Sequence, residues 1–491
     1  MTTEDELRDR LRELAGRAGR PSADGPALAR RIARDSAERR RSRRNVLAGV
    51  GSVILLAIAV PQLVDGGARD ALPASGPVSA PESRIAGGGP AAPRYDDMFA
   101  GPTRGSLAGD SAFVDAVRAL PWSPEPPPSA EDGLPDPPVE TRSVVFAGEV
   151  AGERWALVVG RFADVPPDAE GLPGPDAGPV LLVAAWFTGP GDAGPDAMQL
   201  RSGPSAIARD WPLAVTDSRS GALVVVASPG DVVEVSERPE IRADGTTTRA
   251  WQEVETVDGV AVTRVSPSGW PYDASTSYRV LRNGRTEARD MPWSFPSAEP
   301  SPPVPVQFPR GRPSALGEQA AGFAAEHIVA ELGLSPDEVE ITAQWVGSVP
   351  AGDGGQAAVV TVTLPNGAVV VEGQVLLPEL PGGATTGTFC GQAVLPAGPP
   401  AARRVQAMAC EVVDYTTGAP MSTSLVVVGP PEVALLRTYD DDRRFLTEHA
   451  AVDGVLVVPM PLGTDTVEAV TAGGVTLGRV ELLGHAVDFG D

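Results

Sequence analysis

The feature that most constrains this chain is an uncharged apolar run, residues 46–64, which follows directly on the arginine cluster at positions 39–44. At about 1.5 Å per residue, a helix over this run would be about 28 Å long, close to the thickness of a bilayer core. Basic residues flank the side of such a helix that stays in the cytoplasm. We therefore expect one transmembrane helix over residues 45–65, in contact with the lipid bilayer, with the N-terminus cytoplasmic and the C-terminus extracellular.

Two other interpretations of the same run remain open. A cleaved signal peptide also carries positive charge before an apolar stretch, but its leader and its apolar core are normally shorter than these. A buried helix of a soluble domain is the second alternative. A retained signal anchor in the cell membrane is the interpretation that fits the length best.

The charge of the chain divides at the same place. The formal net charge is −24, yet residues 1–44 are net basic, so the rest of the chain is strongly acidic. All the basic side chains are arginines. An acidic surface repels polyanions, so we expect no nucleic-acid partner.

Internal repetition predicts that the remainder holds two related modules. The segment LVVVASPGDVVEV from Leu223 is echoed by LVVVGPPEVALL from Leu425, and each is followed by Val-Asp-Gly and another alternating strand. The spacing of the paired segments is near 200 residues, which is typical of a duplicated unit. The expected domains are a cytoplasmic tail at 1–44, the transmembrane helix at 45–65, a flexible Ala/Gly/Pro linker at 66–100, module 1 at 101–290, a Pro-rich linker at 291–313 and module 2 at 314–491.

Each module opens with a sequence that predicts a helix. In GDSAFVDAVRAL, Asp110 or Ser111 is a suitable N-cap, and Phe113 and Val117 lie at helical spacing. The second helix is expected from Ser314 to a C-terminal glycine at Gly333. The strands that follow alternate as half-buried antiparallel strands do, so we predict an α+β fold in which each extracytoplasmic module is one helix plus an antiparallel β-sheet or compact β-sandwich.

The two cysteines, Cys390 and Cys410, are expected to form a disulfide, since both lie in the part predicted to be exported. Both flanking segments are typical of strands, and a hairpin closed near residue 400 would place the two cysteines directly opposite each other. Two buried free thiols are the alternative.

The sequence offers no convincing catalytic, cofactor or metal site. His327, His449 and His485 have no partner at metal spacing along the chain, and the common nucleophile, phosphate-loop and zinc motifs do not occur. We interpret these histidines as core or surface residues. The run at 440–442 offers three aspartates for a cation, but consecutive strand residues point to opposite faces, so a solvated turn is favoured.

Tryptophans concentrate in module 1 or at its borders, and aromatic platforms beside acidic side chains can bind sugars. Trp270, Tyr272 and Trp293 are therefore candidates for a surface that binds cell-wall glycan. The function we expect is a non-catalytic, membrane-anchored binding or scaffolding protein of the bacterial cell envelope, with an envelope protein or glycan as partner.

The alternative function is that of a transmembrane regulator that signals through its short tail. Leu7, Leu11 and Leu14 share one face of a predicted helix there. This layout resembles that of membrane-anchored regulators that hold a sigma factor, although the His/Cys zinc motif found in many of them is absent.

Overall fold

The computed structural model describes residues 98–489, with gaps at 100, 123–135, 163–180, 193, 210, 296–300, 351–353, 379–386, 414–419 and 485–488. Within this range the chain forms two halves, residues 98–295 and residues 301–489, which are described one after the other. The predicted tail at 1–44 and most of the predicted linker at 66–100 lie outside the described residues, as does His485.

The prediction of a single-pass membrane protein is corrected by the structure. Among the described residues, no helix has the length and the apolar character needed to cross a bilayer. The longest helix there, α4 (Ala315–Glu331), carries Glu318, Glu326 and His327 within its 17 residues, which is short for a span and too polar for one. The predicted span at 45–65 lies outside the described residues.

The predicted α+β class is wrong as well, because the described chain is mainly β-structure. Its two α-helices are α3 (Ser111–Arg118) and α4, against a much larger number of strands. Both helices do start where the sequence indicates: the Asp110 side chain accepts a hydrogen bond from the Phe113 amide, and the Ser314 side chain accepts one from the Gly317 amide. The predicted class gave the helices too large a share of the fold, since each helix covers only one face of one sheet.

The first half contains an inner sheet and a β-sandwich. The inner sheet is an antiparallel meander of four strands: β1 (Ser143–Val150), β2 (Glu153–Phe162), β3 (Leu181–Pro190) and β4 (Gln199–Ile207). One sandwich sheet has the order β11-β12-β6-β5-β15, with β5 (Leu213–Asp217), β6 (Ala222–Val226), β11 (Thr256–Val257), β12 (Val260–Arg264) and β15 (Trp293–Phe295). The other has the order β10-β7-β13-β14, with β7 (Val232–Ser236), β10 (Gln252–Val254), β13 (Ser277–Arg282) and β14 (Arg285–Asp290). A separate hairpin joins β8 (Pro239–Ile241) to β9 (Thr247–Arg249).

The second half repeats this plan. Its inner sheet is the meander β16 (Glu340–Ser348), β17 (Gln356–Thr363), β18 (Val369–Leu376) and β19 (Gly387–Leu395). Its sandwich sheets have the orders β20-β21-β24 and β23-β22-β25-β26. Their strands are β20 (Gln406–Val413), β21 (Pro420–Val428), β22 (Val433–Tyr439), β23 (Phe445–Ala450), β24 (Val455–Pro459), β25 (Thr466–Thr471) and β26 (Thr476–Glu481).

The strand orders of the two sandwiches correspond one to one. The row β12-β6-β5 matches β24-β21-β20, and β10-β7-β13-β14 matches β23-β22-β25-β26. The second sandwich, with three strands on one sheet and four on the other, has an immunoglobulin-like arrangement, and the first sandwich adds β11 and β15 at the two edges of its corresponding sheet. The Val-Asp-Gly repeat falls at the same turn in both halves, where Asp258 and Asp453 have φ of 51° and 49°.

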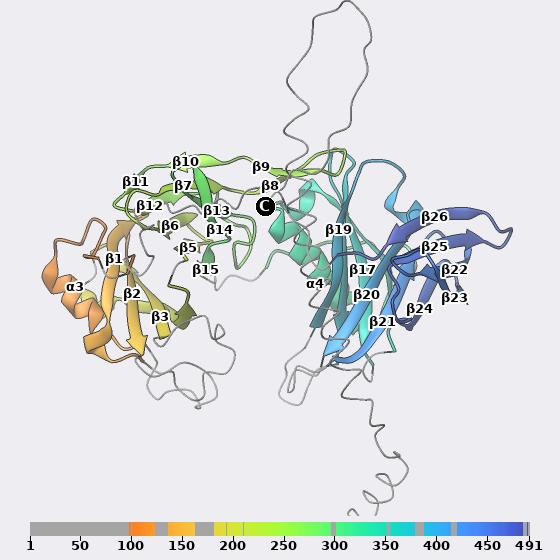
Figure 1. The fold of residues 1–491 in the computed structure, drawn as a ribbon, viewed down its shortest axis with the longest axis horizontal. Coiled ribbons are helices and arrows are strands. Elements are labelled where there is room, and N and C mark those ends of the chain that lie inside the picture. Colours follow the sequence, from red (N-terminus) through yellow and green to blue (C-terminus); the bar gives the residue numbers. More distant parts are fainter. Residues whose placement is uncertain are drawn as a thin grey trace, which may run out of the picture. The chain divides into compact units, whose positions relative to one another are not determined.

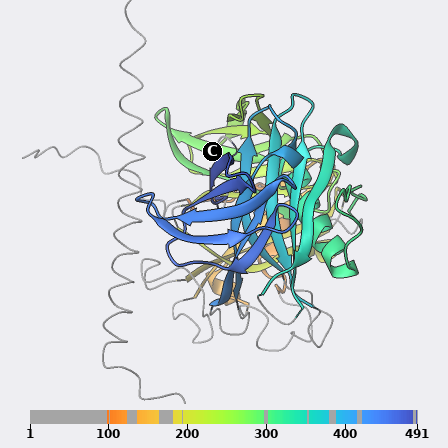
Figure 2. The same ribbon diagram turned by 90° about the vertical axis from the view of Figure 1, so that its right-hand side faces the viewer.

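Each half is layered in the same way, as helix, inner sheet and two sandwich sheets. Three apolar clusters fill the spaces between the layers: one under the helix, one between the inner sheet and the sandwich, and one inside the sandwich. Figure 1 shows α3 beside β1 and β2, and α4 beside the inner sheet of the second half. In Figure 2 the blue strands of the second sandwich lie in front of the cyan inner sheet of the same half.

The same arginine contact ties the sandwich turn to the preceding segment in each half. The guanidinium of Arg104 donates to the backbone oxygens of Ala227 and Asp258, at 2.7 and 3.1 Å. The guanidinium of Arg310 donates to the equivalent oxygens of Gly429 and Asp453. We call this contact the arginine clamp. It is buried at Arg104 and exposed at Arg310.

Candidate functional site

The candidate site lies in the second half, between α4 and its inner sheet. The buried face of α4 consists mainly of small residues, among them Gly317, Ala320, Ala321 and Ala324, so the helix lies close against the sheet. His327 and Glu331 are one helical turn apart and therefore share a face. That face meets Glu372 of β18, and Gln392 of β19 is the cross-strand partner of Glu372.

Four side chains form a connected polar cluster here, which we call the His-Glu cluster. His327 Nδ1 lies 2.8 Å from Glu372 Oε2, and His327 Nε2 lies 3.3 Å from Glu331 Oε1. The Gln392 amide donates to Oε2 of Glu331 at 2.8 Å and to Oε2 of Glu372 at 3.1 Å. Glu372 is 1% exposed, whereas the His327 side chain is 42% exposed, so the cluster runs from the core to the surface.

The charges of the cluster depend on one another. Burial alone would lower the pKa of His327, but the hydrogen bond to Glu372 and the charges of Glu372 and Glu331 outweigh it and raise this pKa to about 9. Burial raises the pKa of Glu372, and the His327 contact opposes that effect. Since both ring nitrogens face carboxylate oxygens, we assign His327 as an imidazolium between two carboxylates in this structure.

The first half has an alanine at the position that corresponds to Glu372. Both inner sheets have a bulge in the first strand, and the strand registers that follow it place Ala185 of β3 where Glu372 lies in β18. Ala185 is fully buried and packs in the apolar cluster under α3. The same scaffold therefore folds around an alanine, and the carboxylate in the second half is an addition that the scaffold does not require.

The cluster also satisfies the geometry of a metal site. The donor atoms of His327, Glu331 and Glu372 all lie within 4.8 Å of one another. Sequence reasoning missed this group, because Glu372 is 45 residues from His327 along the chain. The one available signal was the His-x-x-x-Glu spacing at 327 and 331 on a helix.

The structure buries one of the three residues predicted to form a glycan surface and exposes the other two. Trp270 is buried in the cluster under α4, and its Nε1 donates to the Leu334 oxygen at 3.4 Å, so it offers no platform to a sugar. Tyr272 is 38% exposed and Trp293 is 58% exposed. Burial and the charges of nearby glutamates, Glu331 and Glu372 among them, raise the pKa of Tyr272.

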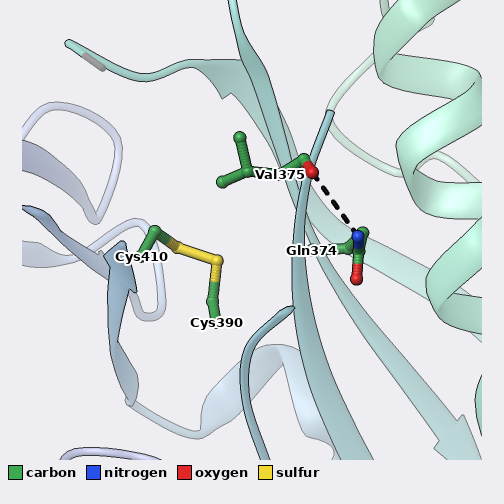
Figure 3. The surroundings of a disulfide bond; sticks show 4 residues. All are labelled: Gln374, Val375, Cys390 and Cys410. Atoms are coloured by element: carbon green, nitrogen blue, oxygen red, sulfur yellow. Dashed lines mark hydrogen bonds between the residues drawn. A yellow bond between two sulfur atoms is a disulfide. The ribbon is translucent and has the colours of Figure 1, made fainter. Parts of the chain in front are cut away.

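Cys390 and Cys410 form a disulfide, with their Cα atoms 4.3 Å apart. The expected hairpin geometry is wrong, because β19 and β20 are not paired: they belong to different sheets. The bond crosses the space between the inner sheet and the sandwich (Figure 3) and lies in the buried cluster with Met408 and Val412.

The aspartates at 440–442 lie in the turn between β22 and β23. Asp440 accepts a hydrogen bond from the Arg444 amide at 2.7 Å, and Asp442 forms an ion pair with the Arg444 side chain at 3.1 Å. Asp441 and Asp442 are exposed. Arg444 therefore closes this turn, and the turn has the character of a solvated loop.

The outer sandwich sheets carry a row of charges at matching positions, which we call the charge rows. Across the first sheet the cross-strand neighbours are Glu253, Glu234, Arg279 and Arg289, so like charges lie side by side at both ends. Across the second they are Glu448, Arg437, Glu468 and Arg479, which alternate in sign.

Aromatic rings cover arginines in both rows. In the first, the guanidinium groups of Arg279 and Arg289 lie 4.6 and 5.1 Å from the Trp251 ring centroid. In the second, Arg479 lies 4.4 Å from the Tyr439 ring centroid. Both outer sheets therefore hold their cations in fixed places.

No protein-family model matches the sequence, and no curated protein sequence matches it. Among solved structures, Drosophila Semaphorin 2a matches at 7% sequence identity with a TM-score of 0.10. The match covers 70% of this chain and 66% of that chain, so this chain spans just under two thirds of its length. A TM-score this low supports no conclusion about fold or function.

Proposed function

We propose that the described part of the chain is a non-catalytic binding or scaffolding module that recognises a protein surface through the outer sheet of its first sandwich. The observation that carries the proposal is the charge row of that sheet. Like charges directly opposite each other across strands destabilise a sheet. A partner surface that presents cations to Glu253 and Glu234 would offset the repulsion between these two carboxylates.

The second charge row serves as the internal reference for this proposal. Its signs alternate, and Arg437 lies 2.8 Å from Glu448 and 3.7 Å from Glu468. Its charges are neutralised within the sheet and gain less from a partner.

The burial of Trp270 weighs against the glycan partner, and the disulfide favours an oxidising compartment.

The alternative function, signalling through residues 1–44, depends on residues outside the described part of the chain. No contact of the described residues favours it.

A charge swap tests the proposal without breaking the sheet. Glu234 and Arg279 form an ion pair. Glu234→Arg combined with Arg279→Glu keeps opposite charges at these two positions but converts the first row to the alternating pattern of the second. Immobilised full chain is exposed to extract from its native source, and captured proteins are identified by mass spectrometry. We expect a partner that wild type captures in low salt and the swapped variant does not.

The matched control is the same operation on the other row, Arg437→Glu with Glu468→Arg. This control should capture the partner as wild type does. Equal capture by wild type and by the first-row variant would refute the proposal, and so would loss of capture only in the control.

A further inference from the structure

We propose that His327, Glu331 and Glu372 form a binding site for a divalent transition-metal ion, for which Zn²⁺ is the suitable probe. This site is separate from the charge rows, so the inference goes beyond the proposed binding function. It rests on the donor set, the donor geometry, the charge of the cluster and the comparison with the first half.

The donor set is one imidazole and two carboxylates. Imidazole nitrogen favours first-row transition metals over Ca²⁺ and Mg²⁺, and carboxylate oxygens complete such sites at the same bond lengths. Two of the donors, His327 and Glu331, come from one face of a rigid helix, and the third, Glu372, from a central strand of the sheet. Sites built on regular elements hold their ligands more accurately than sites built on loops.

The donor atoms are near enough for one ion to reach all three residues. Ligand atoms at about 2.1 Å from a tetrahedral zinc ion are roughly 3.4 Å from one another, and one donor atom from each of the three residues lies within 4.8 Å of the other two. In the metal-free structure His327 Nδ1 faces Glu372 and His327 Nε2 faces Glu331. Since an ion binds only one ring nitrogen, metal binding requires the carboxylate on the other side of the ring to turn toward the ligating nitrogen, with water in the fourth position.

The charge of the cluster favours a dication. Glu331 and Glu372 supply two carboxylates, whose combined charge matches that of a divalent ion. Glu372 is 1% exposed, and a cation bound directly to a buried carboxylate compensates the charge that burial deprives of water.

Gln392 supplies the outer support that metal sites usually have. Its side chain is 3% exposed, and its amide donates to one oxygen of each carboxylate. Hydrogen bonds of this kind orient ligating carboxylates, and their loss weakens metal binding about 10–100-fold. The exposed edge of His327 gives an ion access without opening the core.

A purely structural role explains the cluster less well. Buried ion pairs can often be replaced by apolar side chains without loss of stability. The first half does so with Ala185, which lies at the position equivalent to Glu372. Where one copy of a repeat places a carboxylate and the other an alanine, binding accounts for the difference better than folding does.

The experiment is equilibrium dialysis of the full chain against Zn²⁺, with the bound metal measured by atomic emission. The test variant is Glu372→Ala, which copies the first half and is therefore expected to fold, as circular dichroism would verify. Asp441→Asn, in the exposed aspartate turn, is the matched control. We expect wild type and the control to bind one equivalent of Zn²⁺ that Glu372→Ala lacks, and Gln392→Leu to bind it about tenfold or more weakly.

Equal zinc binding by wild type and Glu372→Ala would overturn the proposal, as would loss of zinc only in Asp441→Asn. Absence of zinc binding by wild type would overturn it too. Should Glu372→Ala prove unfolded, Glu331→Gln decides in the same assay, because its side chain lies at the outer edge of the cluster and its change removes one ligand charge.

Discussion

The two halves of this chain differ most clearly at one position of the inner sheet. Ala185 in the first half and Glu372 in the second occupy the same place in the same strand register, under the same kind of helix. The first is surrounded by apolar side chains, and the second by His327, Glu331 and Gln392. The scaffold therefore tolerates either an alanine or a glutamate at this position, and the glutamate is best explained by what it binds.

A second difference lies between the inner sheet and the sandwich. Cys410 of β20 occupies the place of Asp217 of β5, as the registers against β21 and β6 show. Only the second half therefore has a covalent link between these layers. Four predictions follow the differences between the halves, in order of expected effect.

The largest effect is expected at the arginine clamp. Arg104→Ala should lower the free energy of unfolding by about 4 kcal/mol, because Arg104 is 8% exposed and its removal leaves buried backbone oxygens without their charged donor. Arg310→Ala should lower it by only about 1 kcal/mol, since water can replace the exposed guanidinium. Urea unfolding measures both. Equal losses would mean that burial does not distinguish the two clamps.

Removing the disulfide should come next. The double change Cys390→Ala and Cys410→Ala opens a loop of 20 residues and should lower the unfolding free energy by about 3 kcal/mol. Hydrogen exchange should locate the loss in β19 and β20 and leave β4 and β5 unchanged. Faster exchange in the first half as well would contradict the view that the bond stabilises its own half only.

The third prediction concerns the His-Glu cluster in metal-free protein. Glu372→Ala alone should cost about 2 kcal/mol, because it removes the partner of His327 and one acceptor of Gln392. Adding His327→Leu should restore stability to within about 1 kcal/mol of wild type, since the region then resembles the apolar first half. A double variant as unstable as the sum of its parts, measured in a double-mutant cycle, would indicate that the cluster is needed for folding.

The smallest effect is a difference in alkaline stability. Tyr278 of β13 donates to the Pro212 oxygen at 3.1 Å, and burial raises its pKa well above the ordinary value near 10. A raised pKa contributes stability that is fully present below pH 10 and is lost as the pH rises further. The equivalent position in the second half is Val467, which cannot titrate.

Tyr278→Phe should therefore cost about 1 kcal/mol at neutral pH, for the lost hydrogen bond, and should flatten the fall in stability above pH 10. The comparison variant is Tyr439→Phe in the second half, where the hydrogen bond to Glu468, more than burial, raises the pKa of the tyrosine. Thermal unfolding followed from pH 7 to pH 11 measures both. If stability above pH 10 falls as steeply in Tyr278→Phe as in wild type, a group other than Tyr278 causes the fall.

The sequence predicted local structure well where a single residue decides it. Asp110, one of the two caps expected for the first helix, does cap it, and the second helix begins after Ser314 as expected. The Asn-Gly pairs at 283–284 and 366–367, which are typical of hairpin turns, close hairpins with their glycines at positive φ. These signals are local, because side-chain capping and the left-handed conformation depend on neighbours in the chain.

The sequence failed where pairing between distant strands decides the outcome. The segments around Cys390 and Cys410 were expected to pair, but β19 completes the inner sheet and β20 begins the sandwich. The α+β class was wrong because two clear helix signals outweighed many short strands in the interpretation. The His-Glu cluster was missed for the same reason as the pairing, since Glu372 meets His327 only once the sheet and the helix have packed.

The most direct test of the central claim is anomalous diffraction at the zinc edge from crystals of the full chain grown with Zn²⁺. We predict one strong peak at about 2.0–2.2 Å from a ring nitrogen of His327 and from carboxylate oxygens of Glu331 and Glu372. A peak only at the aspartate turn, or none at the cluster, would contradict it.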